Sequence, residues 1–185
     1  ISAARVFALT KASVAYKGGR FEASAQAVAS HTGSMMGEDA VYEAAFERCG
    51  VVRVTELDDI FDVAEVLAAQ RTPRGPRLAI VSNARGPAII ASDALLSRGG
   101  ELAVLEAETV AILDGLLPPV GSHQNPVDLL DGASADRYRR VLPAVLGDPG
   151  VDGVLVIFAS QSGSDPQATA EAVVEAVQHT RKPVL

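Results

Sequence analysis

Several residue types are scarce in this 185-residue chain, and each scarcity excludes a class of protein. Cys49 is the only cysteine, so no internal disulfide can form and secretion gains no support. Tryptophan is absent and aromatic residues make up 4%, so a core must be built from aliphatic side chains. The apolar run at residues 154–159 is far shorter than the roughly 20 residues that span a bilayer. No signal segment opens the chain, and we expect a soluble, cytoplasmic protein.

Basic residues are also in deficit, with 16 Lys and Arg against 23 Asp and Glu and a formal net charge of −7. A nonspecific nucleic-acid binder or an anionic-membrane binder needs a basic face, so neither nucleic acid nor a membrane is expected among the partners. The charge is unevenly distributed, however. The first 20 residues contain no acidic residue and carry Arg5, Lys11, Lys17 and Arg20.

Short aliphatic runs alternate along the chain with helical apolar stripes, separated by Gly, Pro and Asn. The expected strands are residues 13–17, 51–54, 77–82, 101–104, 153–158 and 184–185. The expected helices are residues 22–29, 39–48, 56–69, 88–97, 108–116, 135–146 and 167–178. This alternation predicts an α/β fold, in which helices cover both faces of a parallel sheet. Such sheets bind ligands at the loops that leave the carboxyl ends of their strands.

Two features predict that the sequence is a piece of a longer protein. It opens at Ile1 rather than Met, and it stops at residues 182–185, where a strand is expected to begin. A weak boundary is expected inside the chain at residues 70–76, where the sequence RTPRGP interrupts the pattern before a new strand.

The first loop that could take part in a reaction is residues 29–37, which places His31 among small and hydroxyl residues. A neutral imidazole nitrogen can act as a nucleophile, a base or a metal ligand. No second His or Cys lies at ligand spacing, so no metal site is expected. Judged alone, a single loop histidine is more often structural or merely exposed.

A second loop, residues 82–87, follows an aliphatic strand and opens a helix. Its backbone N–H groups could receive an anion, with contacts from Asn83, Arg85 and Gly86. Pro87 suits the start of a helix. The plainer interpretation is an ordinary strand-to-helix turn.

Two further loops offer site-edge residues. In residues 124–129, Asn125 precedes a proline and is held extended or in a turn, and Asp128 is expected to anchor neighbouring backbone at the edge of a site. In residues 159–166, Ser164 or Asp165 is expected to cap the next helix, with Pro166 in its first turn. The macrodipole of that helix would favour a nearby phosphate by about 0.3–1 kcal/mol.

Taken in order, several segments resemble the NDP-forming acyl-CoA synthetases, the acyl-CoA:ADP ligases related to succinyl-CoA synthetase. They are residues 17–20 (KGGR), 29–33 (ASHTG), 39–46 (DAVYEAAF), 78–83 (LAIVSN), 125–129 (NPVDL) and 151–157 (VDGVLVI). The resemblance implies that residues 1–45 are the tail of one CoA-ligase subdomain. It implies that residues 46–185 form the next subdomain, a flavodoxin-like parallel sheet with helices on both faces.

The resemblance also implies a reaction and the residues that serve it. His31 would be the phosphohistidine of an acid–CoA ligase, within the loop of Thr32, Gly33 and Ser34. The helix start with Ser162, Gly163 and Ser164 would face the phosphate. The substrates would be CoA, phosphate and ATP or ADP with Mg²⁺, with no tightly bound cofactor. CoA-binding and ATP-grasp domains would be supplied by the same chain or a partner subunit, so this piece alone is expected to be inactive; a homo-oligomer is compatible with the family.

Alternatives stay open at this point. Some relatives fused to an acetyltransferase lack the histidine, so the chain could instead be a noncatalytic domain that senses acyl-CoA or nucleotide for an attached enzyme. It could also be a flavodoxin-like interaction module with no ligand. In addition, many relatives have consecutive glycines where this chain has residues 84–88 (ARGPA). Either Arg85 pairs with phosphate in their place, or the loop has lost a close approach and activity is reduced.

Overall fold

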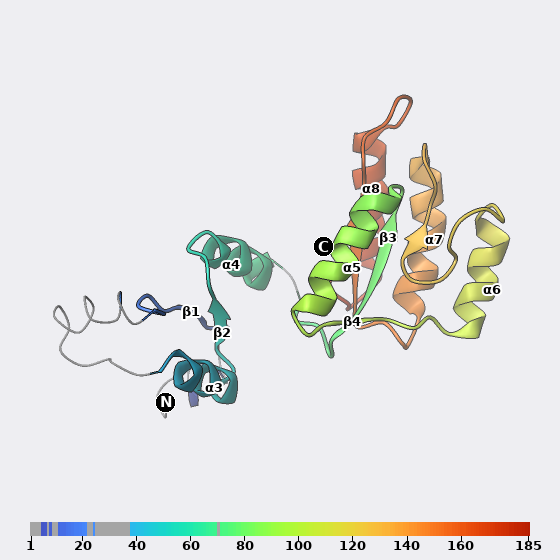
Figure 1. The fold of residues 1–185 in the computed structure, drawn as a ribbon. Coiled ribbons are helices and arrows are strands. Elements are labelled where there is room, and N and C mark those ends of the chain that lie inside the picture. Colours follow the sequence, from blue (N-terminus) through green and yellow to red (C-terminus); the bar gives the residue numbers. More distant parts are fainter. Residues whose placement is uncertain (1–4, 7, 9–10, 22–23, 25–37, 70) are drawn as a thin grey trace. The chain divides into compact units, whose positions relative to one another are not determined.

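A computed structural model describes residues 5–6, 8, 11–21, 24, 38–69 and 71–185, and the chain divides into two compact units, Ile1–Ala69 and Gln70–Leu185. Figure 1 shows the elements of each unit along the chain. The expected helix at residues 22–29 and the histidine loop fall almost wholly outside the described residues.

The first unit contains a pair of parallel strands, β1 (Val14–Tyr16) and β2 (Val52–Val54), in which Val14 lies opposite Val52. Helix α3 (Asp39–Cys49) connects into β2, and α4 (Asp59–Ala69) follows it. Asp39 lies in the first turn of α3 and Arg48 in the last, which suits the helix dipole. The helix ends at Gly50, whose φ of 70° is left-handed and favours glycine.

Residues 46–69 pack with the first compact unit, because β2 pairs with β1, α3 contacts β2 and α4 contacts β1. The division between the two compact units lies at the weak break expected before Arg77. The subdomain division at residue 45 that the resemblance implies stays a prediction.

The second unit is organised around β3 (Arg77–Ser82), whose neighbours all run parallel to it. On one side, β6 (Gly153–Ile157) pairs with it from Leu78 to Ser82. On the other side, two short strands share the edge: β4 (Glu101–Leu102) pairs with its start, and β5 (Val127–Asp128) with its end. Val184 forms a bridge to Val154 beyond β6, where a terminal strand was expected. The sheet is parallel throughout, as predicted.

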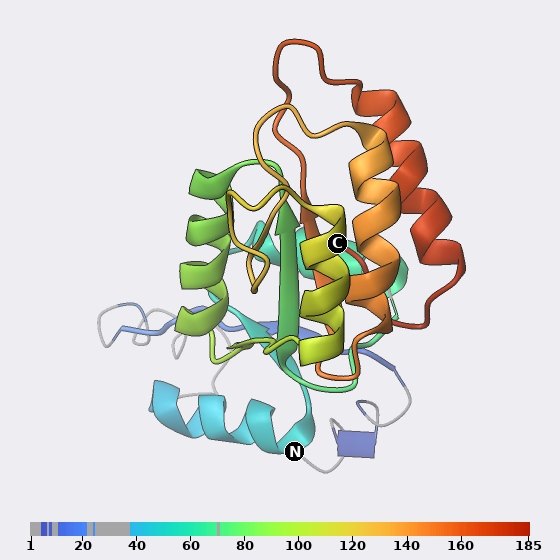
Figure 2. The ribbon, with the colours of Figure 1, turned by 90° about the vertical axis from the view of Figure 1, so that its right-hand side faces the viewer.

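Helices cover both faces of this sheet, as predicted. Helix α5 (Arg85–Ser97) lies on one face, and the opposite face carries α6 (Ala107–Leu116), α7 (Ala135–Gly147) and α8 (Pro166–Gln178), as Figure 2 shows. Residues from α6, α7 and α8 share one buried cluster with Ala79 and Val81 of β3. The apolar run of β3 is buried on both faces, which is typical of a central parallel strand.

Some element bounds differ from the expected ones, and helix α4 begins at Asp59, three residues later than expected. Helix α5 begins at Arg85, three residues earlier than expected, so Pro87 is its third residue. Strand β5 was not predicted, because the two residues that follow Asn125-Pro126 are too few to show the apolar periodicity of a strand.

The carboxamide of Asn125 fills the gap between β4 and β5. Its Oδ1 accepts from the N–H of Ile80 (2.8 Å), and its Nδ2 donates to the carbonyls of Leu78 (2.8 Å) and Ala103 (2.9 Å). Leu129 then resumes the backbone ladder by donating to Ser82 (2.8 Å). One side chain therefore supplies the hydrogen bonds that an uninterrupted edge strand would give to β3. The Asn125-Pro126 peptide bond is cis.

Among the described residues, no helix is long and apolar enough to cross a membrane.

We expect Asn125→Ala to lower the free energy of unfolding by about 1–3 kcal/mol, because it leaves the N–H of Ile80 without a partner in the core. Urea unfolding measures the loss. Gln124→Ala removes a neighbouring but exposed carboxamide and should change stability little. Equal stability of the two variants would contradict the bridging role of Asn125.

Candidate functional site

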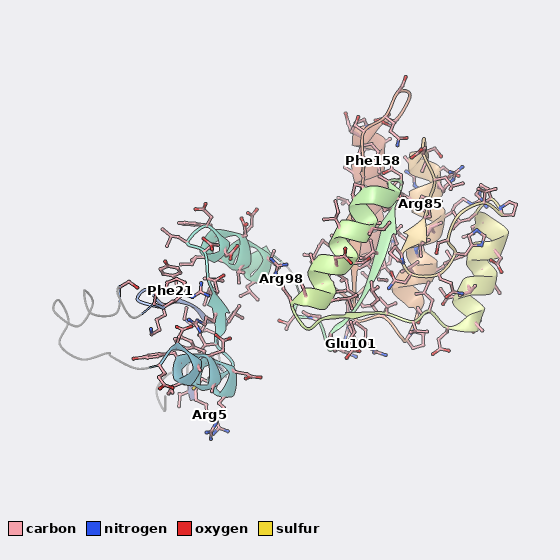
Figure 3. The ribbon with its side chains drawn as sticks, viewed as in Figure 1. Arg5, Phe21, Arg85, Arg98, Glu101 and Phe158 are labelled. Carbon is pink, nitrogen blue, oxygen red and sulfur yellow. The ribbon has the colours of Figure 1, made fainter. Side chains whose placement is uncertain are left out.

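The loops that leave β3, β5 and β6 meet at the carboxyl edge of the sheet in the second unit. Arg85 and Phe158 lie at this end, and Arg98 and Glu101 lie at the opposite end (Figure 3). Three of the four loops selected from the sequence are therefore brought together, because parallel strands end at one edge.

Asn83 joins the ends of β3 and β6 rather than facing a ligand. The residue is 0% exposed, its Nδ2 donates to the carbonyl of Ala159 (2.9 Å), and its Oδ1 accepts from the N–H of Ala159 (2.8 Å). Both ends of the carboxamide are thus used by backbone 76 residues away in sequence. Asn83 therefore holds this edge of the sheet together, and the anion contact expected of it stays a prediction.

Arg85 points toward Asp128 across the same edge. The guanidinium donates to Oδ2 of Asp128 from Nε (3.2 Å) and Nη2 (2.9 Å). Oδ1 of Asp128 accepts from the N–H of Leu130 (2.9 Å), whose φ is +64°. Asp128 therefore anchors backbone, as predicted, and also takes up the charge of Arg85.

A cavity of about 190 Å³ opens beside this ion pair. Its walls include Ser82, Ala88, Ile89, Ser122 and Val127. Gly86 lies in the first turn of α5, and a Cβ there would meet nothing within 4 Å. The small residues around the start of α5 leave space, but the nearest cation is already paired, so the pocket favours an apolar group over a free anion.

The loop after β6 is fixed by its own polar groups. The Ser164 hydroxyl accepts from the N–H of Gln161 (2.9 Å) and donates to its carbonyl (2.7 Å). The Gln161 side chain in turn accepts from the N–H of Gly132 and donates to Asp131 (3.0 Å). Gly163, with a φ of 85°, makes the turn possible.

The start of α8 confirms the predicted cap. Asp165 is the N-cap residue, its carboxylate accepts from the N–H of Ala168 (3.0 Å), and Pro166 lies in the first turn. The Asp165 carboxylate therefore lies at the amino-terminus of α8, where the helix dipole would otherwise attract an anion. Within the described part of the chain, no hydrogen bond uses the N–H groups of Ser162 and Gly163, both exposed at the tip of the loop. An anion at this helix start would therefore be received by the tip of the loop.

An ion pair in the first unit joins a residue that precedes the histidine segment in the sequence to a residue that follows it. His31, Thr32, Gly33 and Ser34 lie outside the described residues. On either side of that segment, Lys17 follows β1 and Asp39 opens α3, with 3.7 Å between Lys17 Nζ and Asp39 Oδ1. Lys17 Nζ also lies 4.5 Å from the centroid of the Tyr42 ring, a cation–π contact.

Arg53 completes this cluster from β2. Its guanidinium, 6% exposed, donates to Asp39 (2.6 Å) and to Glu43. The hydrogen bond from Arg53 holds the pKa of the Asp39 carboxyl below its usual range, and Asp39 raises the pKa of Arg53. We did not select Arg53 from the sequence, although an arginine between two valines of a strand is the signal that could have found it.

His123, in the loop that lines the cavity through Ser122, is held from both sides. Its Nδ1 lies against the carboxylate of Asp114, and its Nε2 lies 2.8 Å from the carbonyl of Pro118. Both neighbours accept hydrogen bonds, so they favour the doubly protonated ring, and the pair with Asp114 is the larger cause of the raised pKa of His123. No group of three or more His, Cys, Asp and Glu in the described ranges is arranged to hold a metal ion.

Residues 78–184, more than half of the chain, match the family described as Ligase-CoA domain, and the chain belongs to that family. Residues 1–67 match the Succinyl-CoA ligase like flavodoxin domain. The two matches fall within the two structural units, which agrees with a boundary near residue 70.

Similar proteins share most of this chain but are longer. The alpha subunit of acetate–CoA ligase [ADP-forming] II from Pyrococcus furiosus is 36% identical over 100% of this chain and 41% of its own length. The 4-hydroxybutyrate–CoA ligase [ADP-forming] of Nitrosopumilus maritimus is 36% identical over 96% of this chain and 25% of its own.

A solved structure is also similar, that of the dinucleotide forming acetyl-coenzyme A synthetase 1 of Ca. Korarchaeum cryptofilum in complex with phosphate and ADP. It superposes with a TM-score of 0.89 at 31% identity, over 99% of this chain and 40% of that one. The chain therefore spans less than half the length of these relatives.

Stability should depend on pH through His123. Folding raises the pKa of the His123 imidazole. The stabilisation that His123 provides is therefore complete below the pKa of the unfolded state, near 6.5, and is lost as the pH rises through the pKa of the folded state. We expect the thermal midpoint of wild type, relative to His123→Gln, to fall by a few degrees between pH 5.5 and 8.5, as calorimetry would measure. His179→Gln, at an exposed position, serves as the control. If the thermal midpoints of wild type and His123→Gln changed in parallel with pH, the proposed contribution of His123 to stability would be wrong.

Proposed function

We propose that this chain is part of an NDP-forming acyl-CoA synthetase, an acid–CoA ligase, in which His31 carries the phosphoryl group. The observation that carries the proposal is the pair of family matches, a Succinyl-CoA ligase like flavodoxin domain over residues 1–67 and a Ligase-CoA domain over residues 78–184. The names of the similar proteins, which are ADP-forming acid–CoA ligases, support the same reaction.

The proposed chemistry moves one phosphoryl group in three steps. Phosphate attacks the thioester carbonyl of acyl-CoA, the C–S bond breaks, and an acyl phosphate and CoA result. A nitrogen of His31 then attacks phosphorus, and the acid leaves with the bridging oxygen. Finally an oxygen of ADP attacks the phosphohistidine, giving ATP and free imidazole. The reverse sequence makes acyl-CoA.

In a chain with more acidic than basic residues, backbone N–H dipoles are better suited than cationic side chains to hold the phosphoryl group. We propose that the N–H groups of Ser162 and Gly163 receive the phosphate, with Ser164 holding the turn in shape through Gln161. Thr32, Gly33 and Ser34 are proposed to leave room for the phosphoryl group beside His31. Arg85 is proposed to hold Asp128 and the loop, since its guanidinium is paired.

The remaining parts of the reaction are assigned to other domains. CoA-binding and ATP-grasp domains, in the same chain or a partner subunit, would bring CoA and the Mg²⁺ complex of the nucleotide. We propose that the complete protein works in the cytoplasm and that this chain alone does not turn over. No tightly bound cofactor is required by the three steps above.

Phosphorylation of the complete protein tests the role of His31. Incubation with γ-labelled ATP should give an acid-labile, base-stable label, and His31→Ala should abolish it. His123→Ala and His179→Ala are matched controls that should keep the label. A complete protein that binds nucleotide but takes no label would favour the alternative, a noncatalytic domain that senses acyl-CoA or nucleotide for a fused acetyltransferase.

A charge placed at the loop tip tests the role of the α8 start. Ser162→Asp should slow phosphorylation of His31 about fivefold or more, since like charges about 4 Å apart in water repel by about 1 kcal/mol. Ser162→Asn has nearly the same shape without the charge and should retain most of the rate. Rapid-quench measurement of label formation gives both rates; unchanged kinetics in folded Ser162→Asp would exclude this placement.

A further inference from the structure

A second polar cleft lies at the amino edge of the same sheet, at the opposite ends of the strands from the loops above. It has a volume of about 550 Å³ and runs between residues 71–74 and residues 179–182. Val151 and Asp152, directly before β6, also line it. This cleft is much larger than the cavity beside Arg85, and it falls within the 300–1,000 Å³ range of small-molecule sites.

Cations dominate the lining of this cleft, although the whole chain carries a net charge of −7. The basic side chains are those of Arg71, Arg74, His179, Arg181 and Lys182. The single acidic lining residue, Asp152, is already paired with Arg77 through Nε (2.8 Å) and Nη2 (2.9 Å). Its charge is therefore compensated, and the cleft keeps a local excess of positive charge.

Hydrogen bonds tie the two walls of the cleft together. Arg71 donates across it to the carbonyl of Thr180, and the Thr180 hydroxyl accepts from the N–H of Lys182 (3.1 Å). The ammonium of Lys182 donates to the carbonyl of Asp148, at the end of α7. Burial lowers the pKa of Lys182, so an anion nearby would favour its charged form.

Two arginines in the cleft remain available for a ligand. In the described part of the chain, no hydrogen bond or ion pair engages the guanidinium of Arg74 or Arg181, and both residues are exposed. The hydrogen-bonded walls of the cleft hold like-charged side chains close together, where they repel one another. A bound anion would relieve that repulsion. Guanidinium groups bind phosphate oxygens in bidentate fashion, which favours phosphate over a monovalent carboxylate.

We propose that the amino-edge cleft is a binding site for a small phosphate-bearing molecule, held by Arg74 and Arg181 with Lys182 at its inner wall. The shared chemistry is a pyrophosphate or paired phosphates, which a nucleoside diphosphate and the nucleotide end of CoA both carry. The site is separate from the α8 start and does not rest on the proposed phosphoryl transfer. It adds an anion site at the end of the sheet where the strands begin.

Titration calorimetry at low salt tests the site with pyrophosphate, ADP, and 3′,5′-ADP as the nucleotide end of CoA. We expect saturable binding that weakens as salt rises, and tenfold or greater loss of affinity in Arg74→Ala/Arg181→Ala. Arg48→Ala/Arg98→Ala removes the same charge at exposed positions outside the cleft and should keep wild-type affinity. Amide NMR shifts on titration should centre on Thr72, Val151 and Thr180.

The ligand series distinguishes the sources of the phosphate. Tighter binding of ADP assigns the cleft to a nucleoside diphosphate, tighter binding of 3′,5′-ADP assigns it to CoA, and equal binding of all three supports recognition of phosphate alone. The proposal is overturned by absent binding or by equal losses of affinity in the two double variants. His31→Ala should bind pyrophosphate like wild type, so this outcome and the outcome of the labelling experiment are independent.

Discussion

The hydrogen-bonding needs of one strand, β3, organise the second unit. Its buried backbone must be paired along both edges, yet β4 and β5 supply only two paired residues each. The carboxamide of Asn125 makes up the difference by pairing with Leu78 and Ile80 between the two short strands. A second carboxamide, that of Asn83, pairs with the backbone of Ala159 and so joins the ends of β3 and β6. These two side chains therefore help to fix the positions of the loops at the carboxyl edge.

Much of this architecture follows from local sequence, and the rest depends on distant partners. The aliphatic run of β3 predicts a buried parallel strand, and Asp165-Pro166 predicts the cap of α8, because both signals lie within a few residues. The roles of Asn83 and Asn125 could not be predicted, since their partners lie 76 and 45 residues away. The boundary near residue 70 likewise depends on the pairing of β1 with β2.

The charge distribution has a structural meaning beyond its net value. Lys17, part of the basic opening, contacts Asp39 and the ring of Tyr42 rather than forming an arm for nucleic acid. At the carboxyl edge, the carboxylates of Asp128, Asp131 and Asp165 all accept hydrogen bonds. The excess of cations is found instead at the amino edge, around Arg74 and Arg181. The two proposed anion sites therefore differ in chemistry: one relies on backbone N–H groups and the other on guanidinium groups.

The most direct test is a crystal structure of the complete protein trapped with its phosphoryl group attached. We expect the phosphoryl group on His31, with its oxygens about 3 Å from backbone N–H groups. A phosphoryl group on another residue, or a phosphohistidine held only by side-chain cations, would contradict this expectation.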